Sequence, residues 1–205
     1  MGTASHYIGL YGWTELSFSD NDRVFCDSLA LLFMARIFGF KLNYLPGAKS
    51  LADLDSKSLE NVYLAPFFLD QFPKDLQITL PMLKTVDVVP QCTLEWLNSK
   101  SKFKRIYVGI STPNQNALGS LLASKYDASI HCVGAAIIEA GTPEFKLVSK
   151  ASGSGFEWFY RAIKSPSRFY TKVRVIIREL LRIIFDSGVR ARFKVFLEMV
   201  DEVNR

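Results

Sequence analysis

The chain has 205 residues, of which 49% are hydrophobic and 22% charged, and its formal net charge is +5. A chain of this length can bury one sizeable core, and its composition excludes an intrinsically disordered protein. No run of about 18 uncharged apolar residues occurs, so we expect no membrane-spanning helix. The first residues also lack the basic and apolar segments of a secretory signal peptide.

From the amino terminus to about residue 150, short apolar runs alternate with helical patterns, which predicts an α/β fold. The expected strands cover residues 7–11, 24–26, 62–65, 86–89, 106–110 and 129–133. Two helices are expected between them. They cover residues 28–38, where Gly39 ends the helix, and residues 116–124, after a turn at residues 111–114.

Cysteine and histidine are too sparse to predict a metal centre. Cys26, Cys92 and Cys132 lie in apolar, strand-like runs without a Cys-x-x-Cys pair, so we expect reduced, buried thiols. His6 and His131 are the only histidines. Structural roles are favoured for both, and no ligand cluster for a metal is predicted.

Positive charge is concentrated near the carboxyl terminus. Between residues 161 and 194, ten basic residues stand against Glu179 and Asp186, so this stretch carries +8 and the rest of the chain −3. Before it, residues 149–155 have the composition of a flexible linker. We therefore expect an α/β body at residues 1–150 and, at residues 151–205, a basic appendage with a polyanionic partner.

The appendage has the pattern of a basic amphipathic helix. Arg174, Arg178 and Arg182 follow one another at a spacing of four, Lys172 precedes them, and aliphatic side chains occupy the other side. Such a helix suits an anionic membrane surface, with these four basic residues at the headgroups. The alternative is packing into the core or into a homo-oligomer. No nucleic acid is favoured as partner, because no aromatic-interleaved basic motif is present.

Asp27 stands at the end of one expected strand and the start of the next helix. In an open α/β sheet, ligands bind beyond the carboxyl ends of the strands, so Asp27 is a candidate site residue. The alternative is that Asp27 caps the helix, because the N-cap position prefers Asp or Ser. The residues alone favour the capping function.

Several motifs follow one another in an order that resembles a known family. They are Val-Phe-Cys-Asp-Ser at 24–28, Ala-Arg-Ile-Phe-Gly at 35–39, Val-Gly-Ile-Ser-Thr-Pro-Asn-Gln-Asn at 108–116, Val-Gly-Ala-Ala at 133–136, Gly-Phe-Glu-Trp-Phe-Tyr-Arg at 155–161 and Ser-Pro-Ser-Arg at 165–168. Together they resemble the WecG/TagA/CpsF glycosyltransferases, which are family 26 of the glycosyltransferases. The Glu-Trp-Phe-Tyr-Arg block is the most specific of them.

The resemblance implies a GT-E type fold, a Rossmann-like, mostly parallel sheet flanked by helices, followed here by the basic amphipathic tail. It implies inverting transfer of a sugar from a UDP-sugar donor to a polyprenyl-diphosphate-linked acceptor in surface polysaccharide biosynthesis, without a catalytic metal or other cofactor. It also implies a bacterial, cytoplasmic enzyme that lies peripherally on the inner membrane surface, next to its lipid-linked acceptor.

Carried over by position, Asp27 matches the proposed general base that deprotonates the acceptor hydroxyl. Gln115 matches the glutamine of a donor-contacting loop. Arg161 and Arg168 match basic positions near the diphosphate, where they would stabilise charge on the leaving UDP. The resemblance places further donor contacts at Thr14, Asn114 and Gly134.

The chain departs from the family pattern at several positions. Serine replaces glycine at residues 28 and 111, and Asn116 and Ile138 stand where the family has acidic residues. The amino-terminal part is also shorter, so the usual Thr-Asn donor strand is reduced to something near Thr14. Two hypotheses follow: an active transferase, which the retained Asp27 favours, and a non-catalytic, membrane-bound partner subunit of another transferase, which Asn116 and Ile138 favour.

Overall fold

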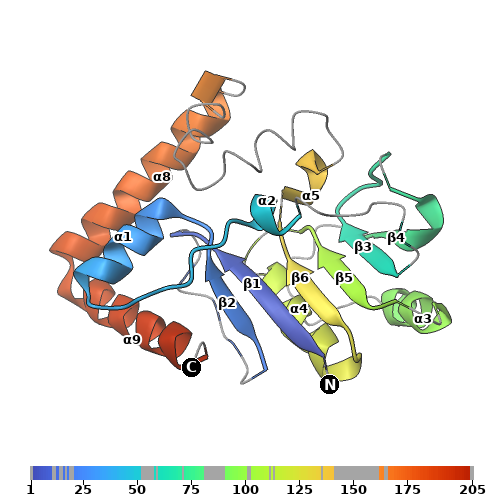
Figure 1. The fold of residues 1–205 in the computed structure, drawn as a ribbon. Coiled ribbons are helices and arrows are strands. Elements are labelled where there is room, and N and C mark those ends of the chain that lie inside the picture. The colour runs from blue at the N-terminus through green and yellow to red at the C-terminus, as the bar shows by residue number, and fades with distance from the viewer. Residues whose placement is uncertain are drawn as a thin grey trace.

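A computed structural model describes residues 2–10, 13, 16, 18, 21–51, 58, 60–70, 72–80, 91–100, 103–110, 112, 114–134, 136–140, 162–163 and 166–203. Its centre is a six-stranded sheet in the order β2-β1-β6-β5-β3-β4 (Figure 1). Every neighbouring pair of strands is parallel. The strands are β1 (Thr3–Ile8), β2 (Arg23–Cys26), β3 (Asn61–Ala65), β4 (Gln77–Thr79), β5 (Arg105–Val108) and β6 (Ser129–Cys132). This confirms the expected Rossmann-like α/β fold with flanking helices.

The expected strand positions are right for five of the six strands, with differences at the ends. β1 begins at Thr3 rather than at residue 7, because the polar Ser5 and His6 hid its first half. β4 was missed, since three residues that begin with glutamine give no apolar run. The strand expected at residues 86–89 lies outside the described residues.

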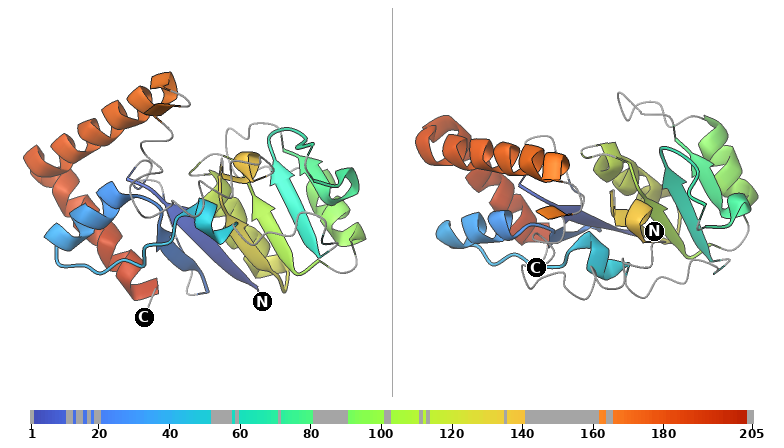
Figure 2. Two further views of the ribbon diagram at one scale, coloured as in Figure 1. Left: turned by 45° about the horizontal axis from the view of Figure 1, so that its top comes forward. Right: turned by 90° about the horizontal axis from the view of Figure 1, so that it is seen from above.

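Helices cover both faces of the sheet (Figure 2). On one face, α4 (Asn114–Lys125) and α3 (Gln91–Ser99) pack over a core of aliphatic side chains that includes Leu118, Leu122 and Leu97. On the other face, α2 (Gly47–Ser50), the 3₁₀ helix η2 (Lys74–Leu76) and α5 (Ala136–Glu139) cover a second core that includes Tyr63 and Tyr107. Alternate residues of each strand supply the two cores, as the pleat of a strand requires.

Three helices gather at the β2 end of the sheet, at the left of Figure 1. They are α1 (Leu29–Ile37), α8 (Pro166–Phe185) and α9 (Ser187–Val203). Phe193, Phe196 and Leu197 of α9 are buried in one cluster with Val24 of β2 and Leu31 of α1. The basic tail is therefore helical, as expected, and its second helix shares a core with the sheet.

The expected helix at 28–38 corresponds to α1, and the one at 116–124 to α4, which begins two residues earlier. The expected linker at 149–155 lies outside the described residues. Among the residues that the structure describes, no helix is both long and apolar enough to cross a membrane.

Candidate functional site

The carboxyl ends of the strands form the edge where ligands bind in open parallel sheets. From β1 the chain continues to β2 on one side, whereas β6, on the other side of β1, is reached from β5. The segments that follow β2, β5 and β6 all begin at this edge of the parallel sheet. The candidate residues that follow β2, β5 and β6 are brought to it.

Asp27 lies at this edge, directly after β2, and its side chain is exposed. Its backbone N–H donates to the carbonyl of Ile8 at 2.7 Å, which ties it to the end of β1. Its Oδ1 accepts a hydrogen bond of 2.8 Å from the backbone N–H of Gly47, the first residue of α2. The first bond fixes the backbone of Asp27, and the second orients its carboxylate toward the start of α2.

The capping function expected for Asp27 is wrong, because the N-cap of α1 is Ser28. The Ser28 hydroxyl accepts from the backbone N–H of Leu31, at 3.4 Å. Both residue types cap helices well, so the sequence could not distinguish them. Since Ser28 performs the capping of α1, the exposed Asp27 carboxylate is available to accept the hydrogen bond from Gly47 at the start of α2.

Gln115 and Gly134 meet at the end of β6. Gly134 has a φ of +55°, and a Cβ at this position would lie 3.3 Å from Oε1 of Gln115. Gln115 is buried, and its Nε2 donates to Oγ1 of Thr112 at 2.9 Å. Its Oε1 has no hydrogen-bond partner among the described residues. A buried acceptor without a partner costs about 1–3 kcal/mol, so it is a candidate ligand contact.

Asp27 and Gln115 are linked by a series of neighbouring residues at the edge of the sheet. A Cβ at Gly47, whose N–H holds Asp27, would lie 3.6 Å from the carbonyl oxygen of Val133. Val133 precedes Gly134, which packs against Gln115. The structure thus brings Asp27, Gly134 and Gln115 to one stretch of the sheet edge. Asn114 belongs to the same place as the first residue of α4.

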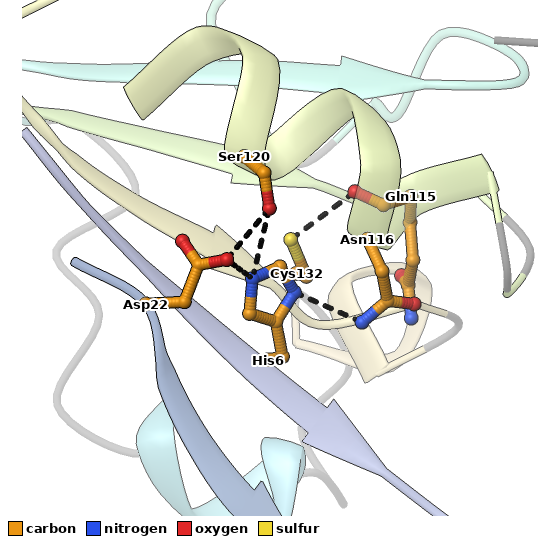
Figure 3. Close-up of polar contacts among 6 residues, drawn as sticks. All are labelled: His6, Asp22, Gln115, Asn116, Ser120 and Cys132. Carbon is orange, nitrogen blue, oxygen red and sulfur yellow. Dashed lines mark hydrogen bonds and ion pairs between the residues drawn. The ribbon is translucent and has the colours of Figure 1, made fainter. Parts of the chain in front are cut away.

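A buried polar network lies beneath this edge, between β1 and α4 (Figure 3). Nε2 of His6 is 3.2 Å from Oδ2 of Asp22, and both side chains are fully buried. Ser120 donates to the same carboxylate oxygen at 2.8 Å and lies 3.4 Å from Nε2 of His6. On the other side of the ring, Nδ2 of Asn116 is 3.0 Å from Nδ1 of His6.

This network is structural, as expected for His6. With the Asn116 amide nitrogen as donor, Nδ1 of His6 accepts and Nε2 carries its hydrogen toward Asp22. A catalytic triad needs the serine and the aspartate on opposite ring nitrogens, whereas Ser120 and Asp22 both contact Nε2. What the network does is anchor the first turns of α4, next to Gln115. Asp22 and Ser120 were missed because about a hundred residues separate them in sequence.

The structure describes only some of the remaining candidate site residues. Arg174, Arg178 and Arg182 lie on α8 and are exposed. Arg182 and Arg178 lie 3.1 and 3.4 Å from the same buried carboxylate, Glu179. Thr14 and Arg161 lie outside the described residues, as do the side chains of Arg168, Lys172 and Ile138.

Burial favours the neutral form of three titratable groups of the sheet, Cys26, Cys132 and His131. Desolvation raises the pKa of the Cys26 thiol to about 11 and also raises that of Cys132, so both are inert thiols, as expected. Burial, assisted by Arg105, lowers the pKa of His131 to about 4. Among the described residues, no three histidine, cysteine or acidic side chains lie close enough together to hold a metal ion.

Comparison with known proteins adds no relative. No family model, no curated protein and no solved structure matches the chain.

Proposed function

We propose that the chain is an inverting glycosyltransferase, a hexosyltransferase that moves a sugar from a UDP-sugar to a polyprenyl-diphosphate-linked acceptor in surface polysaccharide biosynthesis. The observation that carries the proposal is the exposed Asp27 carboxylate, which Gly47 fixes at the carboxyl edge of the sheet while Ser28 caps α1. The resemblance of the ordered motifs to the WecG/TagA/CpsF family supplies the reaction class.

Asp27 would act as the general base. Inverting transfer needs a carboxylate that removes the proton from the acceptor hydroxyl while its oxygen attacks the anomeric carbon. The Gly47 hydrogen bond keeps the carboxylate oriented, which lowers the entropic cost of reaching a reactive geometry. The side chain is exposed, so an acceptor can reach it.

The donor would lie along the ends of β5 and β6. The N-terminus of the 12-residue helix α4 points to this edge, and such a terminus favours a diphosphate. Gln115 offers its Oε1 as an acceptor for a sugar hydroxyl, and the absence of a Cβ at Gly134 permits close approach. By resemblance, Asn114, Thr14, Arg161 and Arg168 complete the donor contacts.

The acceptor would be reached at a membrane. A lipid-linked diphosphate is embedded in a leaflet, and α8 presents Arg174, Arg178 and Arg182 together with Lys172 in its sequence. Basic residues along an amphipathic helix bind anionic headgroups. The proposed location is therefore cytoplasmic and peripheral, on the inner membrane surface.

One observation favours the alternative of a non-catalytic partner subunit. Asn116 replaces an acidic residue of the family pattern, and its amide is engaged with His6 in the buried network. A position that the family uses for an acidic group thus serves the packing of α4. In this alternative the chain would support a companion transferase.

Substitution of Asp27 distinguishes an active transferase from a non-catalytic partner subunit. Asp27→Asn keeps the side-chain shape, so we expect unchanged binding of UDP-sugars by ligand-observed magnetic resonance but loss of transfer by about 100-fold or more. The matched control is Asp127→Asn, an exposed aspartate in the turn before β6, at the opposite edge of the sheet. Transfer by Asp27→Asn at the wild-type rate would refute the assignment of the base.

A further inference from the structure

Helix α1 carries an exposed apolar stripe. Leu29, Phe33 and Ile37 follow one another at a spacing of four, which puts them on one side of the helix. Phe33 is 63% and Ile37 60% exposed, while the opposite side of α1 is buried in the core that it shares with β2 and α9. The only charged residue in α1 is Arg36. A surface helix this apolar is expected to have a partner for its outer side.

Further exposed apolar side chains lie on the helices at the β2 end of the molecule. Thirteen large apolar side chains are exposed among the described residues, and ten of them lie on α1, α8 and α9. On α8, Tyr170, Ile177, Leu181 and Ile184 share one side. Figures 1 and 2 show that the three helices are grouped in every view.

The charge of this surface selects the partner. Helices α1, α8 and α9 together contain nine basic and four acidic residues, and one of the acidic residues, Glu179, is buried. A two-fold contact between copies of this surface would bring together two patches of the same net positive charge, which is unfavourable. An anionic lipid leaflet instead offers acyl chains for the apolar stripe and phosphates for the arginines.

We infer that the outer stripe of α1, formed by Leu29, Phe33 and Ile37, inserts into an anionic membrane leaflet as a second docking element beside the basic helix α8. The inference rests on the membrane partner of the proposed function and extends it from the tail to the body. Because α1 begins two residues after Asp27, this docking places the carboxyl edge of the sheet next to the lipid headgroups. Asp27, the proposed base, then lies at the depth of the headgroups, where the diphosphate of a lipid-linked acceptor is found.

The test is flotation of the full chain with vesicles of phosphatidylcholine that contain about a third phosphatidylglycerol. The variant is Phe33→Ser with Ile37→Ser. The matched control is Phe67→Ser with Phe68→Ser, since these side chains are 49% and 58% exposed but follow β3 instead. All four positions are exposed, so both variants should fold, and their thermal midpoints should lie within a few degrees of the wild type.

We expect the vesicle partition coefficient of the α1 variant to fall by about tenfold or more, because two large apolar side chains no longer insert. The control should stay within about twofold. An α1 variant that floats like the wild type, or a wild type that does not float, would overturn the inference. So would a dimer in sedimentation that the α1 variant dissociates without a change in flotation. Titration with UDP in the absence of vesicles is scored separately, so failure of the donor site would not be mistaken for failure of the docking.

Discussion

Phe193→Ala measures how strongly α9 is joined to the body. The Phe193 side chain is 0% exposed and lies against three rings, those of Trp13, Phe38 and Phe196, at centroid distances of 5.0, 5.7 and 6.0 Å. Its contact with Trp13 is edge-to-face, which is a favourable aromatic geometry. Truncation therefore removes a ring from the middle of the cluster that joins α9, α1 and the sheet.

Truncation of a buried phenylalanine to alanine costs about 3–5 kcal/mol in well-packed cores. Because the Phe193 ring packs against all three of these neighbours, we expect the free energy of unfolding to fall by about 4 kcal/mol. For a urea slope of about 2 kcal/mol per molar, the midpoint should fall by about 2 M. The appropriate control is Val195→Ala on the same helix, because Val195 is 55% exposed and should change stability by less than about 0.5 kcal/mol.

The assay is urea unfolding followed by tryptophan fluorescence, in which Trp13 reports on the cluster and Trp96 on α3. A Phe193→Ala midpoint equal to that of Val195→Ala would refute the reasoning, since α9 would then be attached without sharing the core. If the loss is as large as expected, deleting the tail would also uncover Val24 and Leu31. The tail would then have a structural role as well as any role at a membrane.

Two further predictions concern the sheet. Burial lowers the pKa of His131 from 6.5 to about 4; the unfolded chain therefore takes up the proton first, and stability should fall by up to about 3 kcal/mol as the pH drops from about 6.5 to about 4. His131→Phe should keep the stacking on Tyr107. In denaturant unfolding, the variant should lose less stability than the wild type between about pH 6.5 and 4, and an equal loss in both proteins would exclude His131 as its cause. A Cβ at Gly119 would collide with Sγ of Cys132, so Gly119→Ala should lower the melting temperature by several degrees. Cys132→Ala in the same chain should recover most of that loss, and no recovery would mean that the collision is not the reason.

The fold was predictable where burial produces apolar runs. β2, β3 and β5 contain short runs of that kind, and their spacing to α1 and α4 indicated a parallel α/β sheet. Prediction failed where a buried polar residue interrupts the pattern. Gln77 in β4 is such a case, because its side chain is satisfied by the backbone of Leu69 and Phe72 in the preceding loop.

The candidate site shows the same division. Asp27 and Gln115 were identified from motifs, and the structure places both at the carboxyl edge of the sheet. The choice between Asp27 and Ser28 as helix cap needed backbone geometry, since the two neighbours have similar capping propensities. The partners of His6 needed the tertiary fold, because Asp22 and Ser120 meet only once α4 lies across β1.

The most direct test of the proposed transferase is calorimetric titration of UDP into the full chain in the presence of anionic vesicles. We expect a dissociation constant of about micromolar for UDP, and binding weakened about tenfold or more in Gln115→Ala, whose Oε1 is the buried acceptor at the edge of the site. Absence of detectable binding would contradict a donor site at this edge and would favour the partner-subunit alternative.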